Sequence, residues 1–299
     1  MFNQQPISNV VITAATHGNE MSGIQAIKQW QLNPERIAKF APSSAVQLHL
    51  VNQMAMAANK RFIDQDLNRQ FTHKALSENK ASRLNEHLIA QSFNDKFGPK
   101  GHSATDLLID IHNTTSNMGP TLIVLVNDEF HQQLARFVKT NMPEAIILIE
   151  DFQAYDDFGY LCTVGNKGVM IEVGPQAQGI LKAKAYAETV KMTELILSFV
   201  EAYNSNTLCA MEPVEAFRLG QEIAFPTITV DGATQKAAMI HPQLDGQDFT
   251  LLAKGSPCFI DFDGNEIMWD EEDTYPHFIG EAAYNHLHLA FATSSKCLF

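Results

Sequence analysis

Cysteine is scarce in this sequence of 299 residues, and its four cysteines are widely scattered. No two of them form a Cys-x-x-Cys pair, which argues against a disulfide framework and a thiolate zinc site and favours a reducing compartment. Basic residues are also few, since 21 Lys and Arg stand against 34 Asp and Glu and give a formal net charge of -13. We therefore expect no binding of nucleic acid or of anionic membranes.

Long apolar runs are missing as well. No run reaches the roughly 18 residues that a membrane-spanning helix needs. The segment 1–6 has neither the basic region nor the apolar region of a secretory signal. We expect a protein that works in the cytoplasm and has no membrane partner.

Apolar residues make up 45% of the chain, which is enough to build a large core. Up to about residue 205, apolar β-branched segments alternate with amphipathic segments, and this pattern predicts an α/β fold with a sheet covered by helices. Strands are expected at residues 10–15, 46–51, 107–111, 122–126, 145–149 and 169–173. Helices are expected at residues 22–31, 82–93, 129–141 and 181–202.

The texture of the sequence changes beyond residue 207. Short apolar segments are separated by Asp-Gly and Lys-Gly pairs, which are typical of turns between short strands. Strands are expected at residues 224–230, 249–252, 257–262 and 266–268. We predict a catalytic α/β domain over residues 1–205 and a smaller β-rich domain over residues 206–299 that helps to cover the active site.

Three residues have the chemistry of a zinc site. His17 and Glu20 lie in a small-residue turn after the first expected strand, and Gly18 allows a tight bend there. His112 lies at the end of another expected strand, so the two histidines would meet at one edge of a sheet. Two imidazoles and one carboxylate leave the fourth zinc position open for water. A lone His-x-x-Glu is weak evidence among 11 histidines, and the matching strand ends strengthen it.

Glu172 is the best candidate for a general base. It lies in an otherwise apolar expected strand, where burial would raise its pKa and suit it to take a proton from an attacking water. The alternative is a buried glutamate with a structural role. Asp110 precedes His112 by two residues and would point to the same side, either as the acceptor of a ligand imidazole N–H or as a turn cap.

An anion site is expected in the polar loop after the second strand. Arg61 and Arg69 can each hold a carboxylate through two parallel hydrogen bonds, and Asn68 can add a neutral donor. The alternative is a surface arginine paired with a neighbouring aspartate.

These segments, taken together, resemble the aspartoacylase/succinylglutamate desuccinylase branch of the zinc-carboxypeptidase-like enzymes. The resemblance runs in order from about residue 8 to residue 297. Its motifs are 16–20, 66–69, 110–119, 171–179, 240–242 and 281–284.

The resemblance implies a zinc-carboxypeptidase-like mixed sheet and a definite set of roles. His17, Glu20 and His112 would hold one Zn²⁺ per subunit, and Glu172 would act as general base and then as general acid. Arg61 would polarise the acyl carbonyl, while Asn68, Arg69 and Tyr284 would hold the α-carboxylate of an N-acyl amino acid. The products would be a carboxylic acid and a free amino acid. Members of the family commonly form dimers, so a homodimer is also expected.

The sequence departs from aspartoacylase where the substrate's side-chain carboxylate would be bound. By counting from Glu172 and Tyr284, the three positions expected to contact that carboxylate hold Phe158, Cys162 and His288, and the expected arginine and lysine are missing. N-acetyl-L-aspartate is the first predicted substrate. The alternatives are an aminoacylase that prefers neutral or aromatic N-acetyl amino acids, and a zinc-dependent binding protein without catalytic activity.

Overall fold

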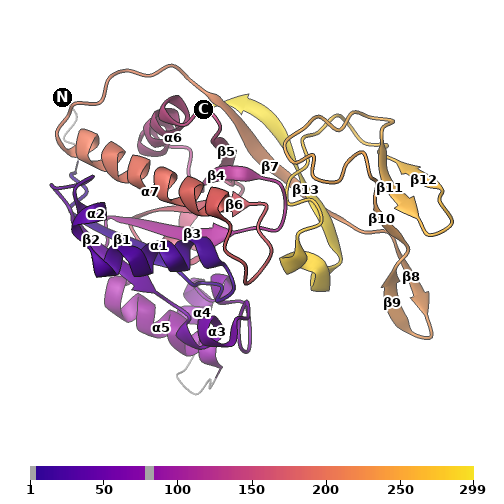
Figure 1. Cartoon of the computed structure of the whole chain (residues 1–299), viewed down its shortest axis with the longest axis horizontal. Coiled ribbons are helices and arrows are strands. Elements are labelled where there is room, and N and C mark those ends of the chain that lie inside the picture. The colour runs from indigo at the N-terminus through magenta and orange to yellow at the C-terminus, as the bar shows by residue number, and fades with distance from the viewer. Residues whose placement is uncertain (1–4, 78–83) are drawn as a thin grey trace.

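A computed structural model describes residues 5–77 and 84–299 of the chain. Two sets of residues discussed above lie outside these ranges: residues 1–4 of the N-terminal segment, and residues 82 and 83 of the helix expected at residues 82–93. The centre is an eight-stranded mixed sheet of order β13-β7-β5-β4-β6-β3-β1-β2 (Figure 1). Its strands are β1 (Asn9–Ala14), β2 (Ala45–Leu50), β3 (Leu107–Asn113), β4 (Gly119–Val124), β5 (Ile146–Ile149), β6 (Lys167–Gly174), β7 (Glu215–Ala224) and β13 (Leu289–Leu298).

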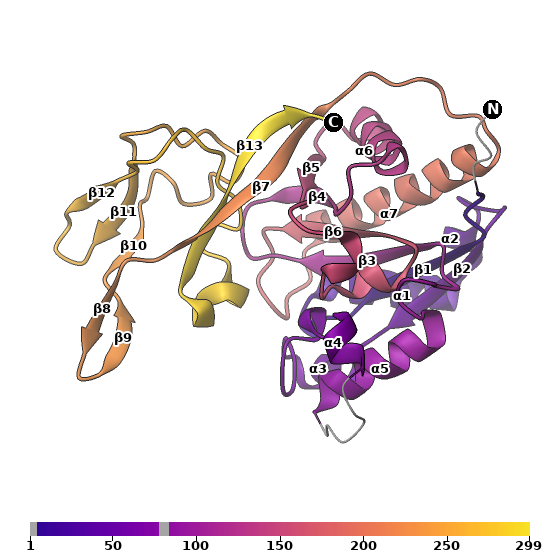
Figure 2. The same ribbon diagram turned by 180° about the vertical axis from the view of Figure 1, so that it is seen from behind.

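Helices cover both faces of this sheet, as Figures 1 and 2 show. They are α1 (Met21–Leu32), α2 (Glu35–Ala38), α3 (Gln53–Ala58), α4 (His73–Ser77), α5 (Asn85–Phe97), α6 (Glu129–Asn141) and α7 (Ala183–Asn204). Short 3-10 helices are η1 (Leu67–Arg69), η2 (Tyr155–Asp157), η3 (Leu161–Val164) and η4 (Ala282–Leu287). Among the described residues, no helix is long and apolar enough to span a membrane.

Strand residues alternate between two apolar cores, because successive side chains point to opposite faces of a sheet. Ile109 of β3 belongs to the core under α1, α6 and α7, whereas Leu108 belongs to the core on the α5 face. All seven residues of β3 are buried, as expected for a central strand with both faces covered. The second of these cores carries the cavity described below.

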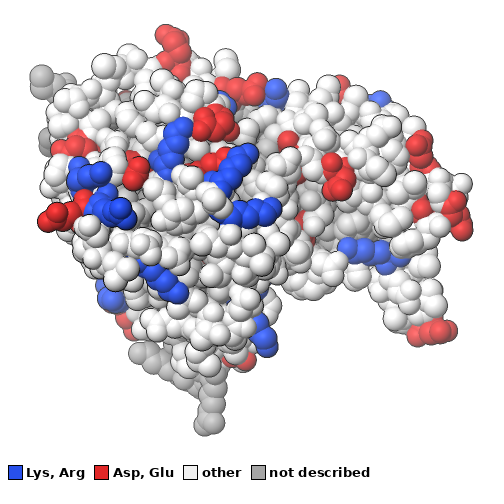
Figure 3. Space-filling model, viewed as in Figure 1, with Lys and Arg blue, Asp and Glu red and all other residues white. Residues whose placement is uncertain are grey.

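The C-terminal part is rich in β-structure and protrudes from the body of the molecule (Figure 1). A three-stranded sheet contains β10 (Ala238–Ile240), β11 (Pro257–Asp261) and β12 (Glu266–Met268), and a separate hairpin contains β8 (Thr227–Val230) and β9 (Ala233–Lys236). Acidic and basic side chains are interspersed on the face shown in Figure 3. The mixed sheet covered by helices and the smaller β-rich C-terminal part confirm the fold class expected from the sequence.

Two features of the C-terminal part differ from the expectation. Residues 249–252 form no strand, and only Leu252 makes an isolated bridge, to Thr274. Strands β7 and β13 pair antiparallel with each other and extend the central sheet through a parallel contact of β7 with β5. The C-terminal segment therefore contributes two strands to the main sheet, and the boundary at residues 205 and 206 stays a prediction.

Core packing between α6 and α7 should contribute strongly to stability. Phe199 of α7 is fully buried and packs edge-on against Phe130 and Phe137 of α6. We predict that Phe199→Ala lowers the free energy of unfolding by about 3–5 kcal/mol, because it leaves a cavity as well as losing apolar burial. Urea denaturation followed by circular dichroism measures this. Leu32→Ala is the control, since Leu32 is 80% exposed, and an equal loss in both variants would contradict the prediction.

Candidate metal centre and active site

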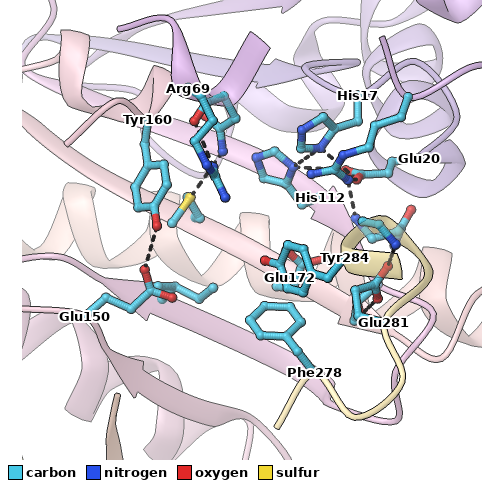
Figure 4. Close-up of a pocket in the computed structure, with 17 residues that line it drawn as sticks. His17, Glu20, Arg69, His112, Glu150, Tyr160, Glu172, Phe278, Glu281 and Tyr284 are labelled. Atoms are coloured by element: carbon cyan, nitrogen blue, oxygen red, sulfur yellow. Dashed lines mark hydrogen bonds and ion pairs between the residues drawn. The ribbon is translucent and has the colours of Figure 1, made fainter. Parts of the chain in front are cut away.

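The three expected metal ligands converge at one point. His17 and Glu20 lie in the turn between β1 and α1, and His112 lies near the end of β3. Strands β1 and β3 are parallel neighbours, so these segments meet although they are far apart in the sequence. One donor atom from each residue lies within 4.8 Å of the other two, and all three side chains are buried. Figure 4 shows them at one side of a cavity.

Close backbone packing gives the turn its shape. A Cβ atom on Gly18 would lie 2.2 Å from the carbonyl carbon of Ala55, which no side chain can tolerate. The Gly18 amide donates a hydrogen bond to the carbonyl oxygen of Arg61 at 3.1 Å. Glycine at this position therefore lets the loop that carries Arg61 approach the turn that carries the metal ligands.

The outer nitrogens of both imidazoles are held by carboxylates. His112 Nε2 lies 2.8 Å from Asp110 Oδ2, and His17 Nε2 lies 3.0 Å from Asp66 Oδ1. An ionised carboxylate can only accept, so each Nε2 is the donor. When a ring is in its neutral form, its lone pair is then on Nδ1, and the two Nδ1 atoms face each other at 3.2 Å.

Glu20 completes the donor set. Its two carboxylate oxygens lie 2.8 Å from His17 Nδ1 and 2.9 Å from His112 Nδ1. Burial by itself would lower the pKa of His112, but Asp110 and Glu20 outweigh burial and raise that pKa well above its usual value. Two imidazole nitrogens and a carboxylate, with carboxylates behind the imidazoles, suit a divalent ion with nitrogen and oxygen ligands, such as zinc.

Arg61 and Asp66 form a charged layer beside the metal ligands. Arg61 donates to Glu20 Oε1 at 3.1 Å and, through two nitrogens, to Asp66 Oδ2 at 3.1 and 3.3 Å. Burial would raise the pKa of Asp66, but His17 and Arg61 outweigh it and hold that pKa well below its usual range. The sequence suggested an aspartate partner for a loop arginine, but it did not show that Asp66 also orients His17.

A cavity of about 480 Å³ opens from the ligand cluster. Its wall brings together eight of the residues expected from the sequence: His17, Glu20, Arg61, Asn68, Arg69, His112, Glu172 and Tyr284. Residues that are remote in the chain thus share one concave site.

Glu172 of β6 is half-buried in this wall, opposite His112 in the sheet register. Burial and the nearby Glu20 raise its pKa well above the usual value. Within the described part of the chain, its carboxylate has no hydrogen-bond partner, so it remains available to groups in the cavity. A carboxylate of this kind can accept and return a proton.

Several cavity residues had no role assigned to them from the sequence. The C-terminal segment contributes Phe278 and Glu281, and the central part of the chain contributes Glu150 and Tyr160. Glu281 accepts hydrogen bonds from Thr114 Oγ1 and from the Thr115 amide at 2.7 Å, and so joins η4 to the loop after β3. Glu150 could have been found from the sequence. It is an acidic residue directly after the apolar strand expected at residues 145–149, much as Glu172 is an acidic residue within an apolar strand.

Three expected substrate contacts do not line the cavity. Phe158 and Cys162 are 1% and 0% exposed and belong to the apolar core, while Tyr160 between them faces the cavity. Burial raises the pKa of the Cys162 thiol well above its usual value. His288 ends η4 in a left-handed conformation with φ of 55° and is not part of the wall. Counting positions along the loop therefore identified the segment but not the side chains that point inward.

Comparisons with known proteins agree with this geometry. Residues 6–200 match the succinylglutamate desuccinylase/aspartoacylase catalytic domain, and residues 212–296 match the AstE/AspA barrel-sandwich hybrid domain. The chain belongs to the succinylglutamate desuccinylase/aspartoacylase family. With its buried His-Glu-His site it is an amidohydrolase of that family.

Relatives within the family carry different names. The chain is 35% identical to the human N-acyl-aromatic-L-amino acid amidohydrolase (carboxylate-forming), over 99% of this chain and 93% of that protein. It is also 35% identical to the aspartoacylase of Danio rerio, over 98% of this chain and 93% of that protein. The crystal structure of murine aminoacylase 3 superposes with a TM-score of 0.90 at 32% identity and covers 99% of this chain and 98% of that one. The relatives thus include both an N-acyl-aromatic-L-amino acid amidohydrolase and an aspartoacylase.

The hydrogen bond from His112 to Asp110 should set the metal affinity. Asp110→Asn keeps the size of the side chain but removes the anionic acceptor that fixes the ring tautomer. We predict that zinc affinity falls about 10- to 100-fold, because partners behind a metal ligand typically contribute that much. Competition with a chromogenic chelator measures it. Asp95→Asn, at an exposed position of α5, is the control, and equal affinities in both variants would contradict the role of Asp110.

Proposed function

We propose that this protein is a zinc-dependent hydrolase that cleaves the amide bond of N-acyl amino acids. The main support is one arrangement: the donors of His17, Glu20 and His112 converge beside the carboxylate of Glu172, which has no hydrogen-bond partner in the described chain. A bound zinc ion would act as a Lewis acid and lower the pKa of a water molecule. A cytoplasmic location and a homodimer stay predictions.

Glu172 is the proton carrier in this proposal. It accepts a proton from the water that attacks the acyl carbon, and it returns that proton to the amine nitrogen as the carbon–nitrogen bond breaks. The water oxygen ends in the released carboxylic acid, and the free amino acid leaves with a neutral or protonated amine. The raised pKa of Glu172 suits both halves of this exchange, because a stronger base accepts a proton more readily and can still release it.

Arg61 and Arg69 differ in the partners that they already have. Arg61 is bound by Glu20 and Asp66 and lies beside the metal ligands, where its charge can polarise the acyl carbonyl. Among the described residues, the Arg69 guanidinium donates a hydrogen bond only to the backbone oxygen of Asn68, at 2.9 Å, and it lies over the Tyr160 ring at 5.2 Å. Its guanidinium therefore remains available to bind the α-carboxylate of the substrate, with Tyr284 and the Asn68 amide beside it.

The side chain of the substrate is the open part of the proposal. N-acetyl-L-aspartate would bring two carboxylates into the cavity, and of the two arginines in the described wall, Arg61 is already paired with two acids. An unpaired buried carboxylate is costly. This charge balance favours the alternative substrates, neutral or aromatic N-acyl amino acids, over N-acetyl-L-aspartate.

The test of the general base is Glu172→Gln. We predict that kcat towards N-acetyl amino acids falls by about 10²- to 10⁴-fold, since proton transfer is lost while the shape is kept. Zinc content should be unchanged, because Glu172 is not a ligand. The assay measures release of free amine from a panel of N-acetyl amino acids by zinc-loaded protein. Glu35→Gln, exposed on α2, is the control. Full turnover by Glu172→Gln would remove the assigned role, and an inactive wild type would favour a binding protein.

The test of the carboxylate site is Arg69→Ala. We predict that KM rises about tenfold or more while zinc binding is retained, because a charge-assisted contact with the α-carboxylate disappears. Steady-state kinetics on the best substrate of the panel measures this, with Arg36→Ala on α2 as a matched surface control. An unchanged KM would show that Arg69 does not hold the substrate.

A further inference from the structure

A second compartment adjoins the active-site cavity on the side away from the metal ligands. Five residues line both spaces: Arg69, Glu150, Tyr160, Phe278 and Tyr284. Figure 4 shows Glu150 and Tyr160 on the opposite side of the site from His17, Glu20 and His112. The second compartment has a volume of about 490 Å³.

The wall of the second compartment is mainly apolar, but its charged groups are mostly acidic. Its apolar side chains come from the loop after β5 and from β7 and β13: Phe152, Leu219, Leu289, Phe291 and Ala292. Its acids are Glu150, inside, and Glu222, at an exposed position. Arg69 is the one Lys or Arg among the described lining residues, and it stands at the junction with the catalytic cavity.

Glu150 is an incompletely paired hydrogen-bond acceptor. It follows β5, is 5% exposed, and accepts a hydrogen bond from the Tyr160 hydroxyl at 3.3 Å. Among the described residues its carboxylate has no other hydrogen-bond partner. Burial raises its pKa to about 7. A ligand that donates a hydrogen bond to a buried acceptor gains binding free energy, whereas an anionic group at the same place is repelled.

Arg69 and Tyr284, which line both compartments, would orient a bound substrate. If Arg69 and Tyr284 hold the α-carboxylate, the α-carbon lies at the boundary of the two compartments. The acyl group then points to the metal ligands and Glu172, and the side chain points to the apolar compartment that Glu150 lines. We propose that Glu150 selects aromatic side chains that carry a hydrogen-bond donor, such as 4-hydroxyphenyl, over phenyl and over carboxylate side chains. This inference rests on the proposed function.

The experiment compares N-acetyl-L-tyrosine, N-acetyl-L-phenylalanine, N-acetyl-L-aspartate and N-acetyl-L-lysine as substrates of the zinc-loaded wild-type protein. The expected kcat/KM for the tyrosine substrate is about tenfold above that for phenylalanine, which is the effect of one hydrogen bond, and higher still relative to aspartate. In Glu150→Leu the tyrosine-to-phenylalanine ratio should fall to about one. Glu150→Gln, which keeps a neutral acceptor, should give an intermediate ratio.

The matched control is Glu144→Leu, at an exposed glutamate just before β5 that pairs with Lys191, and it should keep the wild-type ratio. A wild-type ratio near one, or a preference for aspartate or lysine, would overturn the selectivity even if Glu150→Leu did not fold. An unchanged ratio in folded Glu150→Leu would remove Glu150 as the selecting residue. If N-acetyl-L-aspartate is the best substrate, the proposed function stands and only the selectivity is overturned. If no substrate is hydrolysed, both the function and the selectivity are refuted.

Discussion

Hydrogen bonds between buried carboxylates and imidazoles are the constraint on which the active site depends. Asp110 holds His112 and is itself fixed by the hydroxyls of Thr13 and Thr16, at 2.7 and 2.8 Å, across the β1–β3 pair. These contacts set the orientation of the His112 ring, so that its Nδ1 faces His17 Nδ1 and Glu20. The parallel pairing of β1 with β3 thus does more than build the sheet, because it aligns the donor set.

The C-terminal segment completes the site from outside the central sheet. Glu281 bonds to the loop after β3 and caps η4 through the Ala283 amide at 2.8 Å, which places Tyr284 against the cavity. Asp248 makes a second link, since it accepts hydrogen bonds from the amides of Asn117 and Ile279. The catalytic wall is therefore shared between the two sequence regions, and its shape depends on these two acids keeping their partners.

Most of the fold was predictable because its signals are local. The alternation of apolar strands with amphipathic helices identified six strands of the sheet within a few residues. Strands β7 and β13 were missed as members of that sheet, because they pair across more than 60 intervening residues and β7 is partly exposed. The strand expected at residues 249–252 was wrong, since its apolar residues pack as a loop with only one bridge to Thr274.

For this protein the sequence alone determined the family, the ligand set and the general-base candidate, because those residues occur in short motifs that jointly resemble one family. It also showed that the cations expected for a second carboxylate were missing. Only the tertiary structure decided which side chains of the loop after β5 face the cavity: Tyr160 and Glu150 do, whereas Phe158 and Cys162 turn into the core. The direction of a side chain in an irregular loop is set by packing with segments remote in the chain, and no local pattern encodes that packing.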